Sequence, residues 1–160
     1  MDTKVLKILA DDARCTVEDI ATMTGLSEDD VKKNIKELEE AGIIRGYKTV
    51  IDWEKLDNAS VSALIELKVI PQEEYGFEKI AETVMKYREV ETVYLMSGSY
   101  DLTVIVKGKT FQEVAMFVAK ELATMHGVTS TATHFVLRRY KELDVTLVGE
   151  DKDDRGAYSL

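Results

Sequence analysis

The segment from Val17 to Tyr47 constrains the fold of this chain more than any other stretch of its 160 residues. Its apolar residues recur at intervals of three and four, over a short stretch before Thr24-Gly25-Leu26 and a longer stretch after it. This spacing predicts two helices joined by a tight turn that contains glycine. Such a pair forms a helix-turn-helix unit, whose second helix can enter the major groove of DNA. A small three-helix protein-interaction module is the alternative that spacing alone leaves open.

Residues with suitable chemistry mark both ends of the second predicted helix. Ser27 is placed to accept a hydrogen bond as its N-cap. The acidic run from Glu28 to Asp30 complements the positive charge of the first helical turn. Gly42 follows the last apolar residue of the pattern, where a left-handed C-terminal cap is common. We therefore expect a helix that begins after Ser27 and ends just before Gly42.

A further helix and an extended segment flank this unit. Residues 3–10 carry Val5, Ile8 and Leu9 at helical spacing, which predicts a first helix that packs on the other two. Residues 43–51 are rich in apolar residues and are interrupted by Gly46, which predicts a short extended ribbon at the position of a wing. Residues 1–51 are thus predicted to form a winged helix-turn-helix DNA-binding domain.

The charge of the chain argues against tight binding to DNA of random sequence. The formal net charge is −9, and residues 27–41 hold six acidic residues against three lysines. Phosphate contacts supply most non-specific affinity, so we expect weak, salt-sensitive binding, with specific binding strengthened by dimerisation or higher assembly. The residues expected to contact double-stranded DNA are Arg14, Lys32, Lys33, Asn34, Lys36 and Lys48.

The second half of the chain combines strand-like and helix-like patterns. A polar segment at residues 52–60 is the expected linker to a domain at residues 61–149, and an acidic tail at residues 150–160 is expected to be mobile. In order, the patterns predict a strand at 63–69, a helix at 77–84, strands at 93–96 and 102–106, a helix at 111–122 and a strand at 128–137. A further strand is possible at 144–148. This order is the ferredoxin-like βαββαβ arrangement. The expected fold class is therefore α+β.

A ferredoxin-like sheet has two helices on one face and leaves its other face open. We expect Ile, Leu and Val residues on the open face, and exposed apolar surface of that extent needs a cover. The same face of a second copy supplies one, so the chain is predicted to form a homodimer through this domain.

Composition and motifs give no indication of a disulfide, a membrane span, a metal site or an enzyme active site. The single cysteine, Cys15, excludes an internal disulfide and suits the cytoplasm, and the absence of a long apolar run gives no indication of a membrane span. His126 and His134 lie eight residues apart without a cysteine nearby, so neither a metal site nor a cofactor is expected. The motifs of serine hydrolases and of nucleotide-binding loops are also missing from the sequence, so no enzymatic activity is expected.

Three blocks of the sequence together resemble the Lrp/AsnC (leucine-responsive/asparagine-type, feast/famine) transcription regulators of bacteria and archaea. They read GLSEDDVKKNIKELEEAGIIRGY, YLMSGSYDLTVIV and GVTSTATHFVL, and the resemblance runs from about Thr3 to Tyr140. It implies an N-terminal winged helix-turn-helix and a C-terminal βαββαβ effector domain. Members of the family dimerise through the effector domain and commonly assemble further, to octamers.

The resemblance also implies a small-molecule effector, which in many members is an amino acid bound between dimers. Asp101 is then suited to pair with an α-ammonium group, and backbone N–H groups around Gly98 to hold a carboxylate. An ordinary turn closed by Asp101 is the alternative, with Thr131 and Thr133 as ordinary strand residues. The effector-binding residues implied by the resemblance are Ser97, Gly98, Ser99, Tyr100, Asp101, Thr131 and Thr133.

The sequence departs from the family pattern in its second predicted helix. Asn34 and Glu37 occupy positions that are frequently basic in relatives, and the run from Glu28 to Asp30 is unusually acidic. Two alternatives to a DNA-binding transcriptional regulator follow. One is a regulator-like protein that has lost independent DNA binding and acts by co-assembly with a relative. The other is an enzyme resembling sirohaem decarboxylases, which share the two-domain plan, although their histidine motif is not recognisable here.

Overall fold

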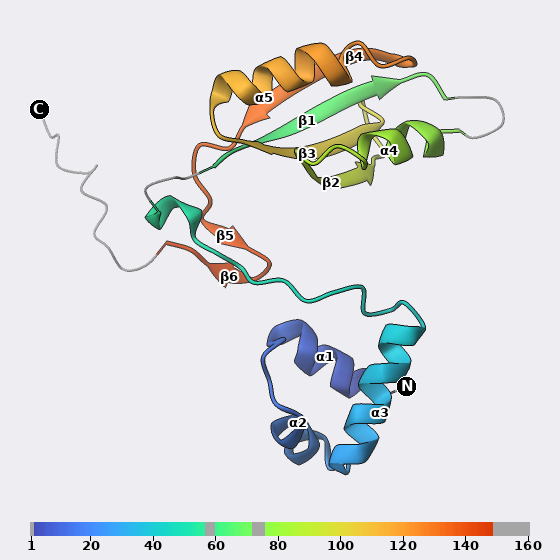
Figure 1. Cartoon of the computed structure of the whole chain (residues 1–160), viewed down its shortest axis with the longest axis vertical. Helices are drawn as coiled ribbons and strands as arrows, with labels where there is room; N and C mark the ends of the chain where they lie inside the picture. Colours follow the sequence, from blue (N-terminus) through green and yellow to red (C-terminus); the bar gives the residue numbers. More distant parts are fainter. Residues whose placement is uncertain (1, 57–59, 72–75, 149–160) are drawn as a thin grey trace, which may run out of the picture. The chain divides into compact units, whose positions relative to one another are not determined.

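The computed structural model describes residues 2–56, 60–71 and 76–148 of the chain. The chain divides into two compact units, Met1–Val50 and Ile51–Leu160 (Figure 1). The predicted tail at residues 150–160 and part of the predicted linker, residues 57–59, lie outside the described residues.

The first unit contains the three helices that the apolar spacing predicts. Val5, Ile20 and Val31, one from each helix, are fully buried and form its core. Because apolar residues three or four apart share one helix face, each helix can direct such a face toward the other two. The helices are α1 (Thr3–Asp11), α2 (Val17–Thr24) and α3 (Glu28–Glu40).

Local chemistry fixes the turn and the ends of α3, as predicted. Gly25 has φ +74° at the end of α2, a left-handed conformation that glycine adopts at little cost. The Ser27 hydroxyl accepts a hydrogen bond from the Asp30 backbone N–H at 3.1 Å. Gly42 has φ +67° just after α3, and its N–H donates to the Glu39 carbonyl at 2.9 Å. The predicted N-cap and left-handed C-terminal residue of α3 are both confirmed.

The segment after α3 differs from the predicted ribbon. Residues 43–51 form no paired strand with any described residue of this chain. Instead, the backbone N–H groups of Ile43 and Ile44 donate to the Leu38 carbonyl at 2.9 and 3.1 Å, and the Tyr47 hydroxyl donates to Glu39 Oε1 at 3.0 Å. An extended segment becomes a strand only when a second segment supplies its hydrogen bonds, and the first unit contains no such segment among its described residues. The segment predicted as a short extended ribbon therefore forms no paired strand among the described residues, although the winged helix-turn-helix class is confirmed.

The second unit has the predicted order of strands and helices. Its sheet runs β2-β3-β1-β4 and all three strand pairs are antiparallel, which is the ferredoxin-like arrangement. The elements are β1 (Val61–Val69), α4 (Glu78–Val84), β2 (Val90–Leu95), β3 (Leu102–Gly108), α5 (Phe111–Phe117) continued by a π-helical turn (Val118–Leu122), and β4 (Val128–Phe135). A short 3-10 helix (Trp53–Lys55) precedes them, and a small hairpin of β5 (Lys141–Glu142) and β6 (Val145–Thr146) follows. Strand β6 lies within the possible further strand at 144–148, whereas β5 precedes that range.

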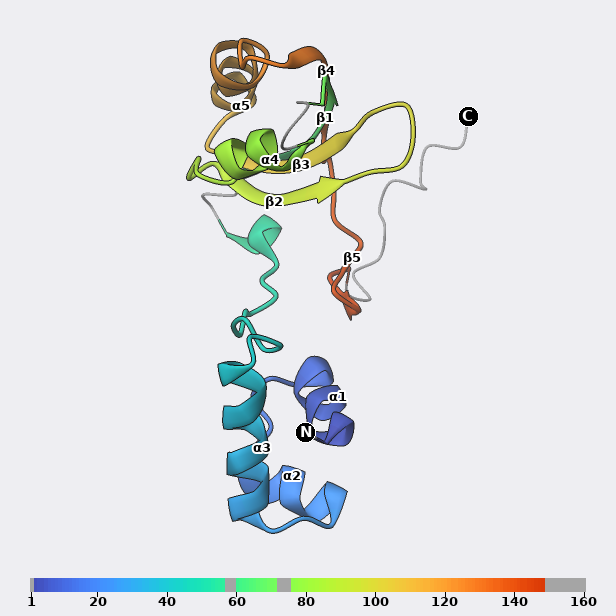
Figure 2. The ribbon, with the colours of Figure 1, turned by 90° about the vertical axis from the view of Figure 1, so that its right-hand side faces the viewer.

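The core of this unit lies between the sheet and its two helices. Helices α4 and α5 cover the same face of the sheet (Figure 2). The central strand β1 presents Ala63, Ile65 and Leu67 to this face, all fully buried. Ile80 and Val84 of α4 belong to the same apolar cluster. Because alternate residues of a strand point to opposite faces, the intervening residues of β1, such as Leu64 and Glu66, face away from the helices.

The open face of the sheet is more polar than predicted. Only two aliphatic residues of the central strands, Leu64 and Ile105, face this side, and both are half-buried. Polar residues lie beside them, and His134 Nε2 lies 3.0 Å from Glu66 Oε2. The open face therefore carries fewer of the expected Ile, Leu and Val residues than predicted, because the strict alternation of β1 and β3 places most of their aliphatic residues against the helices.

Gly127, just before β4, allows a close approach that a larger residue would disturb. Its φ is +94°, and a Cβ at this position would lie 2.9 Å from Ile80 Cδ1. We expect Gly127→Ala to lower the free energy of unfolding by about 1–3 kcal/mol, because alanine is strained at this φ. Fluorescence of the single tryptophan, Trp53, during urea unfolding measures this change in the second unit.

Gly98→Ala is the matched control, since a Cβ at Gly98 would meet nothing within 4 Å. Its unfolding free energy should stay within about 0.5 kcal/mol of the wild-type value or rise slightly. Equal stability of the Gly127→Ala variant and the wild type would contradict this account of the turn.

Candidate DNA-reading helix and effector loop

Helix α3 separates its apolar residues from its lysines. Val31 and Leu38 are buried against the rest of the first unit, whereas Lys32, Lys33 and Lys36 are exposed. Three of the residues predicted to contact DNA are thus brought together on the solvent-facing side of one helix. An ammonium group at the end of a flexible side chain can reach backbone phosphates from such a position.

Asn34 does not belong to this exposed set. It lies on the buried side of α3, is only 9% exposed, and its side-chain Oδ1 has no hydrogen-bond partner among the described residues. Asn34 was expected to contact DNA, but its side chain lies on the buried side of α3 and not on the solvent-facing side. The helical spacing of Val31, Asn34 and Leu38 is the signal that could have revealed this burial, because residues three and four apart share one face.

The other two residues expected to contact DNA lie outside α3. Arg14 is exposed in the connection between α1 and α2, where its backbone N–H donates to Asp12 Oδ1 at 2.8 Å. Lys48 is exposed in the extended segment that follows α3. Both side chains are available to phosphates, although they stand apart from the lysine group in sequence.

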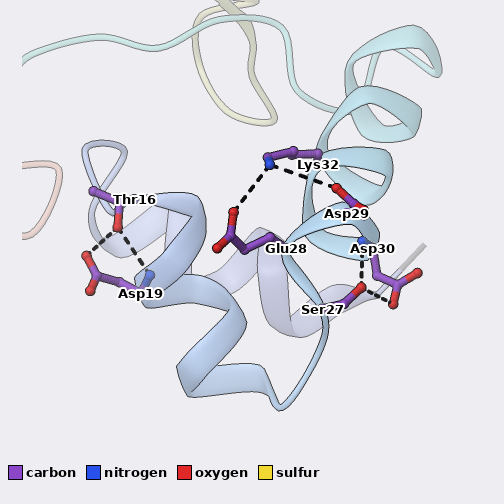
Figure 3. A network of polar contacts seen from close by, with 7 residues as sticks. All are labelled: Thr16, Asp19, Ser27, Glu28, Asp29, Asp30 and Lys32. Carbon is purple, nitrogen blue, oxygen red and sulfur yellow. Dashed lines mark hydrogen bonds and ion pairs between the residues drawn. The ribbon is translucent and has the colours of Figure 1, made fainter.

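Acidic neighbours partly neutralise the α3 lysines. Lys32 Nζ lies 3.3 Å from Glu28 Oε2 and 3.9 Å from Asp29 Oδ1, and Lys36 Nζ lies 3.7 Å from Glu40 Oε1 (Figure 3 draws the contacts of Lys32). These pairs are exposed and hold the lysines weakly, because exposed helical pairs contribute only about 0.3–0.5 kcal/mol. A DNA phosphate can therefore displace the acidic partners of these lysines.

The candidate effector loop, residues 97–101, joins β2 to β3 and is tied to the end of β1 by Asp101. The Asp101 N–H donates to the Leu67 carbonyl at 3.0 Å, and the Asp101 carbonyl accepts from the Met96 N–H at 2.8 Å. Its carboxylate accepts from the Val69 N–H at 2.8 Å and lies 3.2 Å from Lys68 Nζ. Asp101 is thus engaged by its own chain, in keeping with the interpretation of Asp101 as a turn-closing residue.

These contacts favour the ionised form of Asp101. The hydrogen bond from the Val69 N–H, together with the nearby Lys68 ammonium group, holds the pKa of Asp101 below its ordinary value. Lys68 and Val69 could not be predicted as partners of Asp101, because a contact between residues more than thirty positions apart has no local signal in the sequence.

The rest of the loop is open. Ser97, Gly98 and Ser99 are exposed and Tyr100 is half-buried. No atom lies near the space that a Cβ of Gly98 would occupy, so a ligand can approach the backbone there.

The two threonines predicted beside the loop lie on β4. Thr131 pairs with Leu67 of β1, whose carbonyl accepts from the Asp101 N–H. Thr133 pairs with Ile65, two positions farther from the loop along the strands. The structure therefore places Thr131 one strand away from the base of the loop and Thr133 beyond it, with β1 between them and the loop.

Comparison with known proteins decides the family. The sequence model of the Lrp/AsnC ligand binding domain matches residues 62–146, and a winged helix-turn-helix DNA-binding model matches residues 1–45. The chain belongs to the Lrp/AsnC family. It is a transcriptional regulator with a helix-turn-helix DNA-binding domain and a ligand-binding domain. The predicted family, fold class and general function are confirmed, and neither the partner-dependent nor the sirohaem-decarboxylase alternative is favoured.

Several relatives of the Lrp/AsnC regulator align over most of its length. The uncharacterized HTH-type transcriptional regulator YugG of Bacillus subtilis is 41% identical over 155 residues, which cover 96% of this chain and 93% of YugG. The HTH-type transcriptional regulator FL11 of Pyrococcus abyssi is 32% identical over 142 residues, which cover 89% and 91%.

A solved structure extends the comparison to a ligand complex. A transcriptional regulator of Neisseria meningitidis in complex with L-methionine is 26% identical and superposes with a TM-score of 0.71, covering 89% of this chain and 93% of that one. In the part of the chain that the structure describes, no helix is both long and apolar enough to cross a membrane. Among the same residues, no three histidine, cysteine, aspartate or glutamate side chains are grouped to hold a metal ion.

The lowered pKa of Asp101 leads to a testable pH dependence. The ionised carboxylate stabilises the folded state above the unfolded-state pKa, and this contribution is lost as the pH falls through the lower folded-state pKa. The Val69 amide resonance should therefore titrate with a midpoint below about 3.9, the ordinary value for aspartate.

The transition should disappear in Asp101→Asn and should move to higher pH in Lys68→Met, which removes a hydrogen bond and a positive charge that favour the ionised carboxylate. A Val69 midpoint at or above the ordinary aspartate value would contradict the proposed contact.

Proposed function

We propose that this Lrp/AsnC regulator binds operator DNA through α3 of each copy in a homodimer, and that a small molecule at the effector loop changes how the copies assemble. The proposal that α3 binds DNA rests on its exposed lysine group, Lys32, Lys33 and Lys36. The opposite face of α3 packs into the core of the helix-turn-helix domain. Arg14 and Lys48 add phosphate contacts from the flanking segments, and Asn34 serves the core.

The proposed dimer forms through the open face of the sheet. Leu64 and Ile105 are only half-buried in the single chain, and Tyr94 is 54% exposed beside them. A second copy can bury these side chains and can satisfy Glu66 and His134 through polar contacts at the same surface. Further association, to an octamer, would bring effector loops of neighbouring dimers together. A protein that sediments as a monomer would contradict this part of the proposal.

For the effector we propose an amino acid, supported by the L-methionine complex of the Neisseria meningitidis relative. The exposed backbone around Gly98 offers N–H groups for its carboxylate. Asp101 is already paired with Lys68 and the Val69 N–H, so we assign it the role of positioning the loop. The ammonium group of the effector would then bind loop carbonyls or a neighbouring copy.

The mechanism we infer is a population shift between assemblies. An effector bound between dimers favours one arrangement of the α3 helices over another, and therefore one set of half-site spacings. We infer that the protein works in the cytoplasm, where the chromosome lies, and that it has no enzymatic activity; its relatives bear the names of transcriptional regulators.

The lysine group provides the test of DNA binding. Replacing Lys32, Lys33 and Lys36 together by alanine should lower affinity for the upstream region of the protein's own gene by about tenfold or more. The slope of log affinity against log salt should fall by about one for each phosphate that the variant no longer binds. Fluorescence anisotropy at two salt concentrations measures both quantities.

Alanine at Lys86, Lys109 and Lys120 removes the same charge from the exposed surface of the second unit and serves as the control. Its affinity should remain within about threefold of the wild-type value, because these lysines lie outside the helix-turn-helix domain. If the α3 triple variant binds its upstream DNA like the wild type, Lys32, Lys33 and Lys36 do not make the DNA contacts.

A further inference from the structure

The first turn of α3 presents acidic side chains where a DNA-reading helix makes its contacts. In helix-turn-helix proteins, residues at the N-terminal end of the second helix approach the base edges. Helix α3 begins with Glu28, Asp29 and Asp30, which precede its first lysine, Lys32. Three carboxylates in this position repel phosphates, so their presence in a DNA-binding helix calls for an explanation.

Asp30 is explained by the helix cap. Its backbone N–H donates to the Ser27 hydroxyl, and the same hydroxyl donates to Asp30 Oδ2 at 2.6 Å (Figure 3). Thr16 and Asp19 form the same pair of contacts at the start of α2. Asp30 therefore stabilises the beginning of α3, as Asp19 does for α2.

The presence of Glu28 is accounted for by its ion pair with Lys32, in which Glu28 Oε2 lies 3.3 Å from Lys32 Nζ. Asp29 differs from both neighbours. Its side chain is 97% exposed and its carboxylate lies 3.9 Å from Lys32 Nζ, at the outer limit of an ion pair. Of the three acidic residues in this turn, Asp29 is thus the one whose carboxylate is most weakly held by its own chain and is available to a ligand of α3.

We propose that Asp29 is a specificity-determining residue that accepts a hydrogen bond from cytosine N4 in each operator half-site. This inference rests on the proposed binding of DNA through α3. A carboxylate can only accept hydrogen bonds, and cytosine offers an N4 donor in the major groove. Adenine offers a donor as well, but its N7 acceptor lies beside that donor and repels a carboxylate.

The same residue weakens binding to other sequences. Where Asp29 meets no donor, its charge remains unpaired beside the phosphates, which lowers affinity. Lys32 lies between Glu28 and Asp29 and can turn to a phosphate once Asp29 is bound to a base. The acidic turn thereby favours the operator over the many competing sites on a chromosome.

Asp29→Asn provides a direct test, because asparagine pairs with adenine through N6 and N7. Binding-site selection from randomised DNA should give the wild-type protein one position in each half-site that requires cytosine. In the variant, preference at that position should move toward adenine, with a change in discrimination of about tenfold. Affinity for random DNA should rise.

Glu40→Gln is the matched control, since it removes one acidic charge from the last turn of the same helix. It lies eleven residues from Asp29, about 16 Å along the helix axis. This variant should raise affinity for all sequences by a similar factor and leave the base preferences unchanged.

The outcomes separate the inference from the function on which it rests. If Asp29→Asn changes affinity for every sequence equally, as Glu40→Gln should, Asp29 acts only through its charge and the inference is wrong. Unaltered base preferences and affinities would overturn it as well. A wild-type protein that binds no DNA would overturn the proposed function itself.

Discussion

Strand β1 is the element on which the ligand-binding domain depends, because it hydrogen bonds to β3 on one side and to β4 on the other. Its alternation buries Ala63, Ile65 and Leu67 beneath α4 and α5. The intervening residues must then lie on the open face, where we propose a second copy binds. At its end, Lys68 and Val69 hold Asp101 at the base of the effector loop. Core, proposed dimer surface and loop are therefore positioned by one strand.

The same separation of faces governs the DNA-binding domain. Burial of Val31 and Leu38 turns the lysines of α3 toward solvent, and capping by Ser27 fixes where the helix begins. Because acidic residues neutralise part of that lysine group, the helix is poorly suited to hold DNA by charge alone. Its contribution is better understood as selectivity, with affinity supplied by several copies acting together.

Periodicity and capping chemistry are local, and they were sufficient to predict the helices, the strand order and the ends of α3. Features that depend on distant partners could not be predicted. The pairing of Asp101 with Lys68 and Val69 joins residues far apart in sequence, and the segment after α3 lacks, among the described residues, the strand partner that its apolar pattern indicated. Asn34 was also expected to contact DNA, but its side chain is buried, as its helical spacing with Val31 and Leu38 indicates. Which residues contact DNA or effector stays a prediction.

A hydroxyl-radical footprint of the intact protein on its own upstream DNA, with and without L-methionine, tests the proposed mechanism directly. A relative binds this amino acid, which makes it the first ligand to use. We expect protected segments spaced by whole turns of DNA, and a change in their number or spacing when the effector binds. A footprint and an assembly state that stay the same with each of the twenty amino acids would contradict the claim that an amino acid at the effector loop controls how the regulator reads DNA.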